Sequence, residues 1–278
     1  MKIKAFFKLL RLFDAKGYFL FCLFGFLLAK GFNFPLTDIL IFWILVFLGA
    51  GFAFSINECF DQKEDKFNFT KENPILKKEI TFKRATIFSL SLAFLGLIIA
   101  FFYSFEIFLF SLFGGLLIFF YSAPPLRFKS NPPLDILSHG LFGGTLLVAF
   151  PFFFFKTEIY LFHIFIFILA FFVSVLLELR NEYEDFEADK LGGVRTTAHI
   201  LGKEKTKKII NFLILGYLFL LFSFFGIFVQ KFLFVFFSLI LIFLAFFLFF
   251  PNFKFTKNYK LLDFFNVLSW SLILLAKI

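Results

Sequence analysis

The sequence carries very little charge for its length. Only 17% of its 278 residues are charged, whereas 61% are hydrophobic, and the mean hydropathy is +0.93. A soluble domain of this size has far more polar surface. Long apolar runs between short charged clusters instead predict a polytopic membrane protein, in which the bilayer surrounds most of the apolar side chains.

Cysteine and histidine are scarce as well. Cys22 and Cys59 are the only cysteines, and they show neither a disulfide framework nor the spacing of metal ligands. No histidine is spaced to complete a zinc site. The alternating pattern of barrel strands is also missing, and backbone groups in hydrocarbon must otherwise pair within helices. The sequence therefore predicts an all-α protein.

We expect nine transmembrane helices in a single transmembrane domain over residues 1–278. The basic start of the chain leads into an apolar stretch without a small-residue cleavage site, so the first span is expected to be retained. The predicted spans cover residues 17–34, 38–57, 85–104, 105–122, 134–155, 158–180, 208–229, 231–250 and 261–277.

The distribution of Lys and Arg predicts the orientation. Of the 28 basic residues, 24 fall in the N-terminal segment and in the loops after the even-numbered spans. The positive-inside rule then places the N-terminus and these loops in the cytoplasm, for a multi-pass protein of the cell membrane. The net charge of +9 does not indicate a nucleic-acid partner, because these basic residues flank hydrophobic spans and face lipid headgroups.

Two acidic motifs share one spacing. "NECFDQKED" begins at Asn57 and "NEYEDFEAD" begins at Asn181, and both read N-E-x-x-D-x-x-x-D at the cytoplasmic end of an even-numbered span. Residues four apart lie on one face of a helix, so each motif predicts a stripe of one Asn and two Asp. The two stripes are Asn57, Asp61 and Asp65, and Asn181, Asp185 and Asp189.

Carboxylates grouped at a membrane boundary repel one another and are costly to desolvate, so the repeated pattern predicts a bound cation. Carboxylate and amide oxygens suit Mg²⁺, which also bridges to phosphates, although Ca²⁺ accepts the same ligand types. Two such stripes facing one another would hold a diphosphate, whose departure the metal assists. The alternative is a pair of solvated helix ends followed by salt-bridged loops.

A third polar cluster, "YSAPPLRFKS", starts at Tyr121 on the same side of the membrane. Pro124 and Pro125 end the fourth span. Arg127 and Lys129 alternate, so an extended loop would aim both side chains in one direction. They are predicted to contact diphosphate oxygens, unless they only anchor the loop to lipid headgroups.

At these three motifs the chain resembles the UbiA superfamily of intramembrane prenyltransferases. The family pattern is an N-D-x-x-D-x-x-x-D motif after the second helix, an Asp-rich motif after the sixth and a "YSxPPxRxK" loop after the fourth. The resemblance implies a helical bundle around a cavity open to lipid. It also implies Mg²⁺-dependent transfer of a prenyl group from a polyprenyl diphosphate to a lipophilic acceptor, with release of diphosphate.

The resemblance assigns roles residue by residue. It implies that Asn57, Asp61 and Asp65 bind one metal ion, and that Asp185 and Asp189 bind another with help from Asn181 or Glu182. It also implies that Arg127 and Lys129 bind diphosphate and that Tyr121 and Ser122 face the acceptor. We expect Asp61, Asp185 and Lys129 to be the catalytic residues. Two positions depart from the family: Glu58 replaces an Asp, and Asn73 replaces the Arg before Pro74. Either Lys71, Lys77 or Lys78 supplies the phosphate contact of that Arg or the contact is lost, and we favour Lys71.

The acceptor is left open at this point. The loop from Tyr121 is more similar to that of members that prenylate carotenoids or chlorophyllides than to that of 4-hydroxybenzoate members. Quinone-precursor and glycerol-phosphate lipid acceptors also fit, and donor length and oligomeric state have no signal in the sequence. The rival classes are a membrane transporter, a non-catalytic protein that binds prenyl lipids, and a CDP-alcohol phosphotransferase, whose D-G-x-x-A-R motif is missing.

Overall fold

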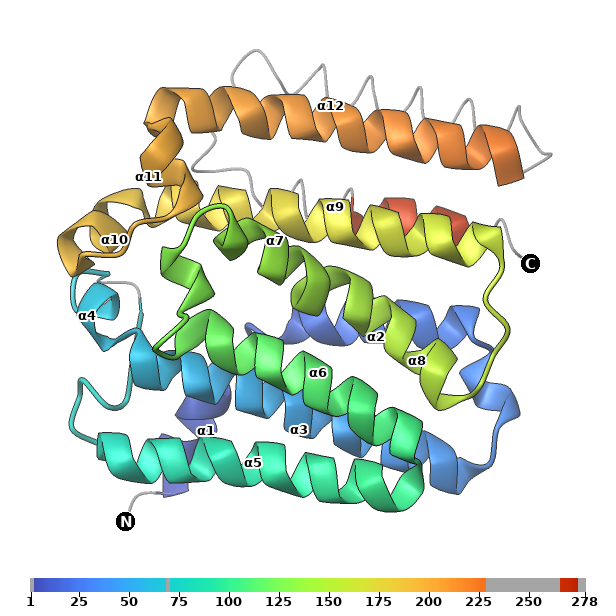
Figure 1. Cartoon of the computed structure of the whole chain (residues 1–278), viewed down its shortest axis with the longest axis horizontal. Helices are drawn as coiled ribbons and strands as arrows, with labels where there is room; N and C mark the ends of the chain where they lie inside the picture. Colours follow the sequence, from blue (N-terminus) through green and yellow to red (C-terminus); the bar gives the residue numbers. More distant parts are fainter. Residues whose placement is uncertain (1–2, 69–70, 229–265, 275–278) are drawn as a thin grey trace.

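The computed structural model describes residues 3–68, 71–228 and 266–274. Across these ranges the chain is helical and contains no β-strand. The long helices lie side by side along one direction, and the short helices α4, α10 and α11 gather at one end of the bundle (Figure 1). The α-helices are α1 (Ile3–Leu10), α2 (Lys16–Leu28), α3 (Leu36–Phe60), α4 (Gln62–Asp65), α5 (Phe82–Tyr103), α6 (Phe105–Ser122), α7 (Leu134–Gly140), α8 (Leu146–Phe154), α9 (Leu161–Glu184), α10 (Phe186–Gly192), α11 (Thr197–Leu201) and α12 (Lys203–Phe228).

Residues 266–274 are also helical. Three short segments connect the α-helices. Two are 3₁₀ turns, η1 (Gly31–Asn33) and η2 (Phe128–Ser130). The third, η3 (Leu141–Thr145), is a π-helical turn that joins α7 to α8 without a break, so residues 134–154 form one span.

The expected all-helical membrane architecture is confirmed, whereas the count of nine spans is not. Five described helices are long and apolar enough to cross a membrane: α3, α5, α6, α7 through α8, and α9. Helix α2 is apolar but has only 13 residues, and α12 is a 26-residue helix that begins with charged residues. The predicted span 231–250 lies outside the described residues, and 261–277 is described only over residues 266–274.

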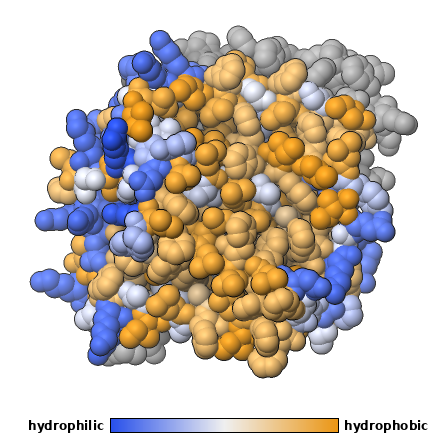
Figure 2. Space-filling view, in the orientation of Figure 1, coloured by the Kyte–Doolittle hydropathy of each residue, from blue (hydrophilic) through white to orange (hydrophobic). Residues whose placement is uncertain are grey.

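The outer helices expose apolar surface that only lipid would cover. Only 17% of the most apolar stretch of α5, and of α6, is buried. Phe94, Phe102 and Phe105 are more than half exposed on these helices. A broad hydrophobic band runs across the molecule between a hydrophilic end over α4, α10 and α11 and a smaller hydrophilic area at the opposite end (Figure 2). This pattern supports the expectation that the bilayer surrounds many of the apolar side chains.

Two buried clusters hold the bundle together, and α2 contributes to both. Phe24 and Leu28 pack with Val148, Ile166 and residues of α12, whereas Cys22 and Phe26 of the same helix pack with side chains of α3, α6 and α8. In a bilayer these contacts stabilise the bundle mainly by van der Waals packing, because lipid tails are as apolar as the side chains that they would otherwise cover. Helix α2 therefore lies inside the bundle, between the helices that carry the two acidic motifs.

Candidate active site

Both acidic motifs have the same backbone construction. The expected helix is interrupted at the middle aspartate in each: α3 ends before Asp61 (φ −90°, ψ 11°) and α9 ends before Asp185 (φ −83°, ψ 4°). These angles lie in a sparsely populated region where active-site residues are often found. The i to i+4 backbone bonds nevertheless continue across both breaks, with N···O distances of 2.9 Å into and out of each aspartate. The stripe spacing therefore survives, although the helix does not run straight through it.

The short helices that follow these aspartates bring the two motifs together. Helix α4 of the first motif packs against α10 of the second. Gly192 makes this close approach possible, because a Cβ atom at that position would lie 2.6 Å from the Cα of Glu64. Two segments far apart in the sequence thus meet at the hydrophilic end of the bundle (Figure 1).

The loop after α6 supplies positive charge to the first motif. Lys129 forms an ion pair with Asp61, and its Nζ lies 3.5 Å from Glu64 Oε1. Arg127 Nη2 donates to Glu64 Oε1 at 2.6 Å and lies 3.6 Å from Asp61 Oδ1. The expectation of an extended loop is wrong: Arg127 adopts a left-handed backbone conformation (φ 35°), and Lys129 lies in the 3₁₀ turn η2. The turn still directs both side chains to the same pair of carboxylates.

The segment after the first motif reaches the second motif. Lys71 Nζ lies 3.2 Å from Asp65 Oδ1 and 3.8 Å from Asp185 Oδ2, and Asn68 donates to Asp185 at 3.0 Å. Asn73, which stands where the family has Arg, donates to Asp65 Oδ2 at 2.9 Å and to the carbonyl of Glu58. Asn73 therefore organises the first motif, and Lys71 bridges the two motifs.

Burial and charge act against each other on these groups. Burial would lower the pKa of Lys129, but the carboxylates of Asp61 and Glu64 outweigh it and raise that pKa. Burial would raise the pKa of Asp61, but Lys129 and Lys71 hold it below its usual value. Burial raises the pKa of Asp189 to about 6, because Lys129 and Lys71 only partly compensate for desolvation. The first motif thus carries a firmly ionised carboxylate against an ammonium that stays protonated.

A cavity of about 980 Å³ opens between the motifs and the interior of the bundle. Its polar end and its apolar walls belong to one continuous space. Leu20, Phe21, Phe54 and Trp270 contribute to the walls. Most of the predicted site residues line it, namely Asn57, Asp61, Asn181, Asp185, Asp189, Lys71, Lys129, Tyr121 and Ser122.

Two predicted residues do not line this cavity. Asp65 is buried behind it, against Asn73 and Lys71, and Arg127 is turned toward Glu64 and the carbonyl of Phe60. Their assigned roles in metal and diphosphate binding stay predictions. Lys77 pairs with Glu72 on the surface and Lys78 is exposed, so Lys71 is the basic residue of this segment that lines the cavity.

The donor atoms at the polar end suit a hard divalent cation. Within the described ranges, no three His, Cys, Asp or Glu side chains come together in the manner of a preformed metal site. Asp61 lines the cavity, and its Oδ1 is nevertheless buried and accepts no hydrogen bond from the described residues. This carboxylate and the amides of Asn57 and Asn181, which line the same cavity, are the ligand types that Mg²⁺ takes together with substrate phosphates. The residues present therefore fit Mg²⁺.

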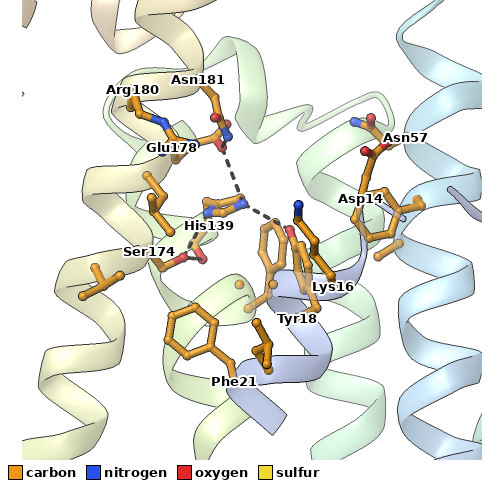
Figure 3. A pocket seen from close by; sticks show the side chains of 18 of the residues that line it. Asp14, Lys16, Tyr18, Phe21, Asn57, His139, Ser174, Glu178, Arg180 and Asn181 are labelled. Carbon is orange, nitrogen blue, oxygen red and sulfur yellow. Dashed lines mark hydrogen bonds and ion pairs between the residues drawn. The ribbon is translucent and has the colours of Figure 1, made fainter. Parts of the chain in front are cut away.

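A second polar network lies deeper in the same cavity, and sequence analysis missed it. Tyr18, His139, Ser174 and Glu178 converge on one another from α2, α7 and α9 (Figure 3). Tyr121 also donates to Glu178, and Asn181 donates to it at 3.3 Å. One signal was available: Glu178 precedes Asp185 by seven residues, about two helical turns, and therefore lies on the face of the second stripe.

Comparison with known proteins gives one consistent result. Residues 18–273 match the UbiA prenyltransferase family. A digeranylgeranylglyceryl phosphate synthase of Methanococcus maripaludis is 31% identical over 234 residues, which cover 82% of this chain and 81% of that protein. The enzyme of the same name from Pyrococcus horikoshii is 31% identical over 198 residues, which are 68% of this chain and 65% of the relative.

Solved structures show the same fold. A UbiA homologue from Archaeoglobus fulgidus, bound to DMAPP and Mg²⁺, superposes with a TM-score of 0.73 at 21% identity, over 98% of this chain and 97% of that one. The same homologue bound to GPP and Mg²⁺ gives a TM-score of 0.72 at 20% identity, with the same coverage of both chains. At this level of identity the likeness concerns the fold of the helical bundle.

Proposed function

The chain belongs to the UbiA prenyltransferase family, and from that premise we propose that it transfers a prenyl group from a polyprenyl diphosphate to a hydroxyl group of a glycerol-phosphate lipid, with Mg²⁺ as cofactor. Family membership makes the chain a prenyltransferase, and its apolar helices make it a multi-pass membrane protein. The acceptor, the metal and the residue roles are the proposed part.

The observation that carries the proposal is the single cavity with two chemically different ends. At one end, acidic residues of both motifs lie beside Lys71 and Lys129. The remainder is walled by aromatic and aliphatic side chains. A prenyl diphosphate has the same division, with a charged head and a long apolar tail. The cavity therefore suits the donor along its whole length.

The names of the relatives favour a glycerol-phosphate lipid as the acceptor. Proteins that are 31% identical to this chain are digeranylgeranylglyceryl phosphate synthases, a name that specifies a prenylated glycerol phosphate as product. An acceptor of that class is an alcohol with a phosphate and an apolar chain. We therefore prefer it to the carotenoid, chlorophyllide and quinone-precursor acceptors that the loop from Tyr121 also suggests.

The chain's own residues would bind the donor by its head. Lys129 and Lys71 would contact diphosphate oxygens, and Lys129 stays protonated because two carboxylates raise its pKa. Asn57, Asp61, Asp65, Asn181, Asp185 and Asp189 would hold Mg²⁺. When bound, Mg²⁺ would neutralise part of the negative charge that develops on the departing diphosphate.

The allylic carbon gains positive charge as its bond to diphosphate breaks. The apolar walls would then keep water away from this carbon, so that the acceptor hydroxyl is the nucleophile that reaches it. Phe21, Phe24, Phe54 and Phe142 line the cavity, and the faces of aromatic rings stabilise nearby positive charge. These rings would therefore add to the stabilisation of the cation.

The rival classes lose their support. A transporter, a phosphotransferase or a non-catalytic lipid-binding protein would not be expected from a chain that matches a prenyltransferase family over residues 18–273. Catalysis by this family also accounts for two acidic motifs that share one cavity with two lysines.

The direct test is a transfer assay in membranes that contain the protein. Several prenyl diphosphates would be crossed with a prenylated glycerol phosphate, a carotenoid precursor and 4-hydroxybenzoate, each with and without Mg²⁺. We expect product with the glycerol phosphate, in the presence of Mg²⁺ only. Product with another acceptor alone, or a rate that persists after chelation of divalent ions, would contradict the proposal.

A further inference from the structure

We propose that His139 accepts the proton that the acceptor hydroxyl loses during transfer, with Glu178 and Ser174 as its positioning residues. The inference rests on the proposed function, because it requires an alcohol as acceptor. His139 lies in the wall of the cavity, and Tyr121, which the family resemblance assigns to the acceptor, lies beside it with ring centroids 6.0 Å apart. The imidazole is therefore close to where the acceptor is expected.

Two glycines after His139 allow the histidine to approach α9. A Cβ atom at Gly143 would lie 2.9 Å from the His139 ring and 3.0 Å from Ser174 Oγ. A Cβ atom at Gly144 would lie 2.4 Å from the carbonyl oxygen of Ala170. Both glycines belong to the π-helical turn η3, and such turns are frequent at functional sites. The segment is thus built for close contact between His139 and α9.

Hydrogen bonding assigns the tautomer of His139. Ser174 Oγ donates to the backbone carbonyl of His139 at 2.9 Å, which uses its only proton. The same oxygen lies 3.0 Å from His139 Nδ1, so it must accept there, and Nδ1 must carry hydrogen. In the neutral ring, Nε2 then carries the lone pair, to which Tyr18 can donate across 3.1 Å and to which the acceptor hydroxyl would donate in its place (Figure 3). Nε2 is therefore the atom that can accept a proton.

The carboxylate of Glu178 provides the negative charge that favours protonation of His139 Nε2. Its Oε2 lies 3.5 Å from His139 Nε2, so a protonated imidazole would form an ion pair with it. The side chain of Glu178 is only 10% exposed. An acidic residue within a membrane-spanning helix is costly to desolvate, and such residues typically mark functional sites. Tyr121 and Asn181 donate to the same carboxylate, which holds it in place.

The chemistry balances with the groups present. The allylic carbon–oxygen bond of the donor breaks, and its electron pair leaves with diphosphate. A lone pair of the acceptor oxygen forms the new ether bond, and the hydroxyl proton moves to His139 Nε2. This is general-base catalysis by a histidine with an orienting carboxylate, and such catalysis contributes typically ~10²–10⁴-fold to a rate.

The test compares two acceptors in purified, lipid-reconstituted protein. One is a prenylated glycerol phosphate, and the other carries fluorine next to the hydroxyl, which makes that hydroxyl more acidic and less dependent on a base. We expect His139→Gln to lower kcat by about 10²-fold with the first acceptor and clearly less, relative to wild type, with the second. Mg²⁺-dependent binding of the prenyl diphosphate should stay within about threefold of wild type, as general-base loss does not weaken ground-state binding.

Two further variants separate catalysis from folding. Ser174→Ala should lower kcat in the same acceptor-dependent way but by less, because the imidazole remains. Ser138→Ala is the matched control: its hydroxyl bonds only to backbone carbonyls of its own helix, at Leu134 and Asp135, so it should leave kcat unchanged.

Two results would overturn the inference. One is an unchanged kcat in His139→Gln, and the other is an equal loss with both acceptors in both active-site variants, which would indicate a structural role. If the wild type itself fails to prenylate the glycerol phosphate, the proposed function fails instead, and the two failures are distinguishable.

Discussion

Lys71 Nζ lies 3.8 Å from Asp185 Oδ2, and this contact joins the segment after the first acidic motif to the middle aspartate of the second. The same ammonium lies 3.2 Å from Asp65 Oδ1. One cation therefore spans the two motifs. It also lines the cavity, whereas Asn73 stands where the family has Arg.

The position of Lys71 predicts a binding role. Lys71→Ala should raise the KM for the prenyl diphosphate by about 10-fold or more, because a hydrogen bond to a charged group is typically worth ~1.5–3 kcal/mol. Lys77→Ala is the matched control, since Lys77 pairs with Glu72 on the surface. Steady-state kinetics at varied donor concentration would distinguish the two variants. Equal donor KM values in both would contradict a contact between Lys71 and the diphosphate.

Lys129 and Arg127 are predicted to differ, although both were assigned to diphosphate. Lys129 lines the cavity, so Lys129→Ala should lower kcat by ~10²–10³-fold, more than it raises donor KM. Arg127 is turned to the buried carboxylate of Glu64, so Arg127→Ala should mainly destabilise the protein. Breaking a buried pair typically costs ~3–5 kcal/mol. Steady-state kinetics and thermal unfolding in detergent, measured on both variants, would test this difference. An Arg127→Ala protein that is stable but has a low kcat would contradict it.

The metal prediction concerns the middle aspartates. Asp61→Asn and Asp185→Asn should each abolish transfer and weaken the Mg²⁺ dependence of donor binding, because an amide is a poorer ligand for Mg²⁺ than a carboxylate. Asp185 is 34% exposed, so that variant in particular should fold normally. Glu187→Ala provides a control within the second motif, because Glu187 is 68% exposed and pairs with Lys203. A near-wild-type rate in either Asn variant would contradict a site built from both motifs.

Much of this arrangement could be predicted from sequence because it follows from local spacing. Residues four apart share a helix face, so the stripes of Asn57 and Asn181 were visible as repeats. The sequence also predicted that the basic loop after α6 belongs to the same site, and Lys129 lines the cavity there, although its ion pair with Asp61 was not predicted.

Other features depend on tertiary contacts that no local pattern encodes. The left-handed backbone of Arg127 and the inward position of Asp65 follow from packing between segments distant in sequence. The network around His139 was missed for the same reason. His139 and Glu178 belong to different helices, and only the close approach at Gly143 and Gly144 brings them together.

The orientation in the membrane stays a prediction, and reporter fusions would test it. The charge distribution predicts that a reporter inserted after Lys71 lies in the cytoplasm and that one fused after Ile278 lies outside. The hydrophilic end over α4 and α10 would then face the cytoplasm (Figure 2). If both reporters gave the same side, an odd number of spans would be wrong.

The final prediction concerns the order of bond breaking and bond making. Lys129, whose charge is maintained by Asp61 and Glu64, contacts the end of the cavity where the diphosphate is expected, whereas the walls beyond it are apolar. This arrangement favours a transition state in which departure of the diphosphate runs ahead of attack by the acceptor hydroxyl, so that positive charge develops on the allylic carbon while the hydroxyl proton is being transferred. Fluorine near that carbon withdraws electrons and destabilises the charge. A fluorinated donor should therefore bind with similar affinity but react much more slowly. Single-turnover measurements with both donors would isolate the chemical step, and equal rates there would show that the carbon–oxygen bond does not break first.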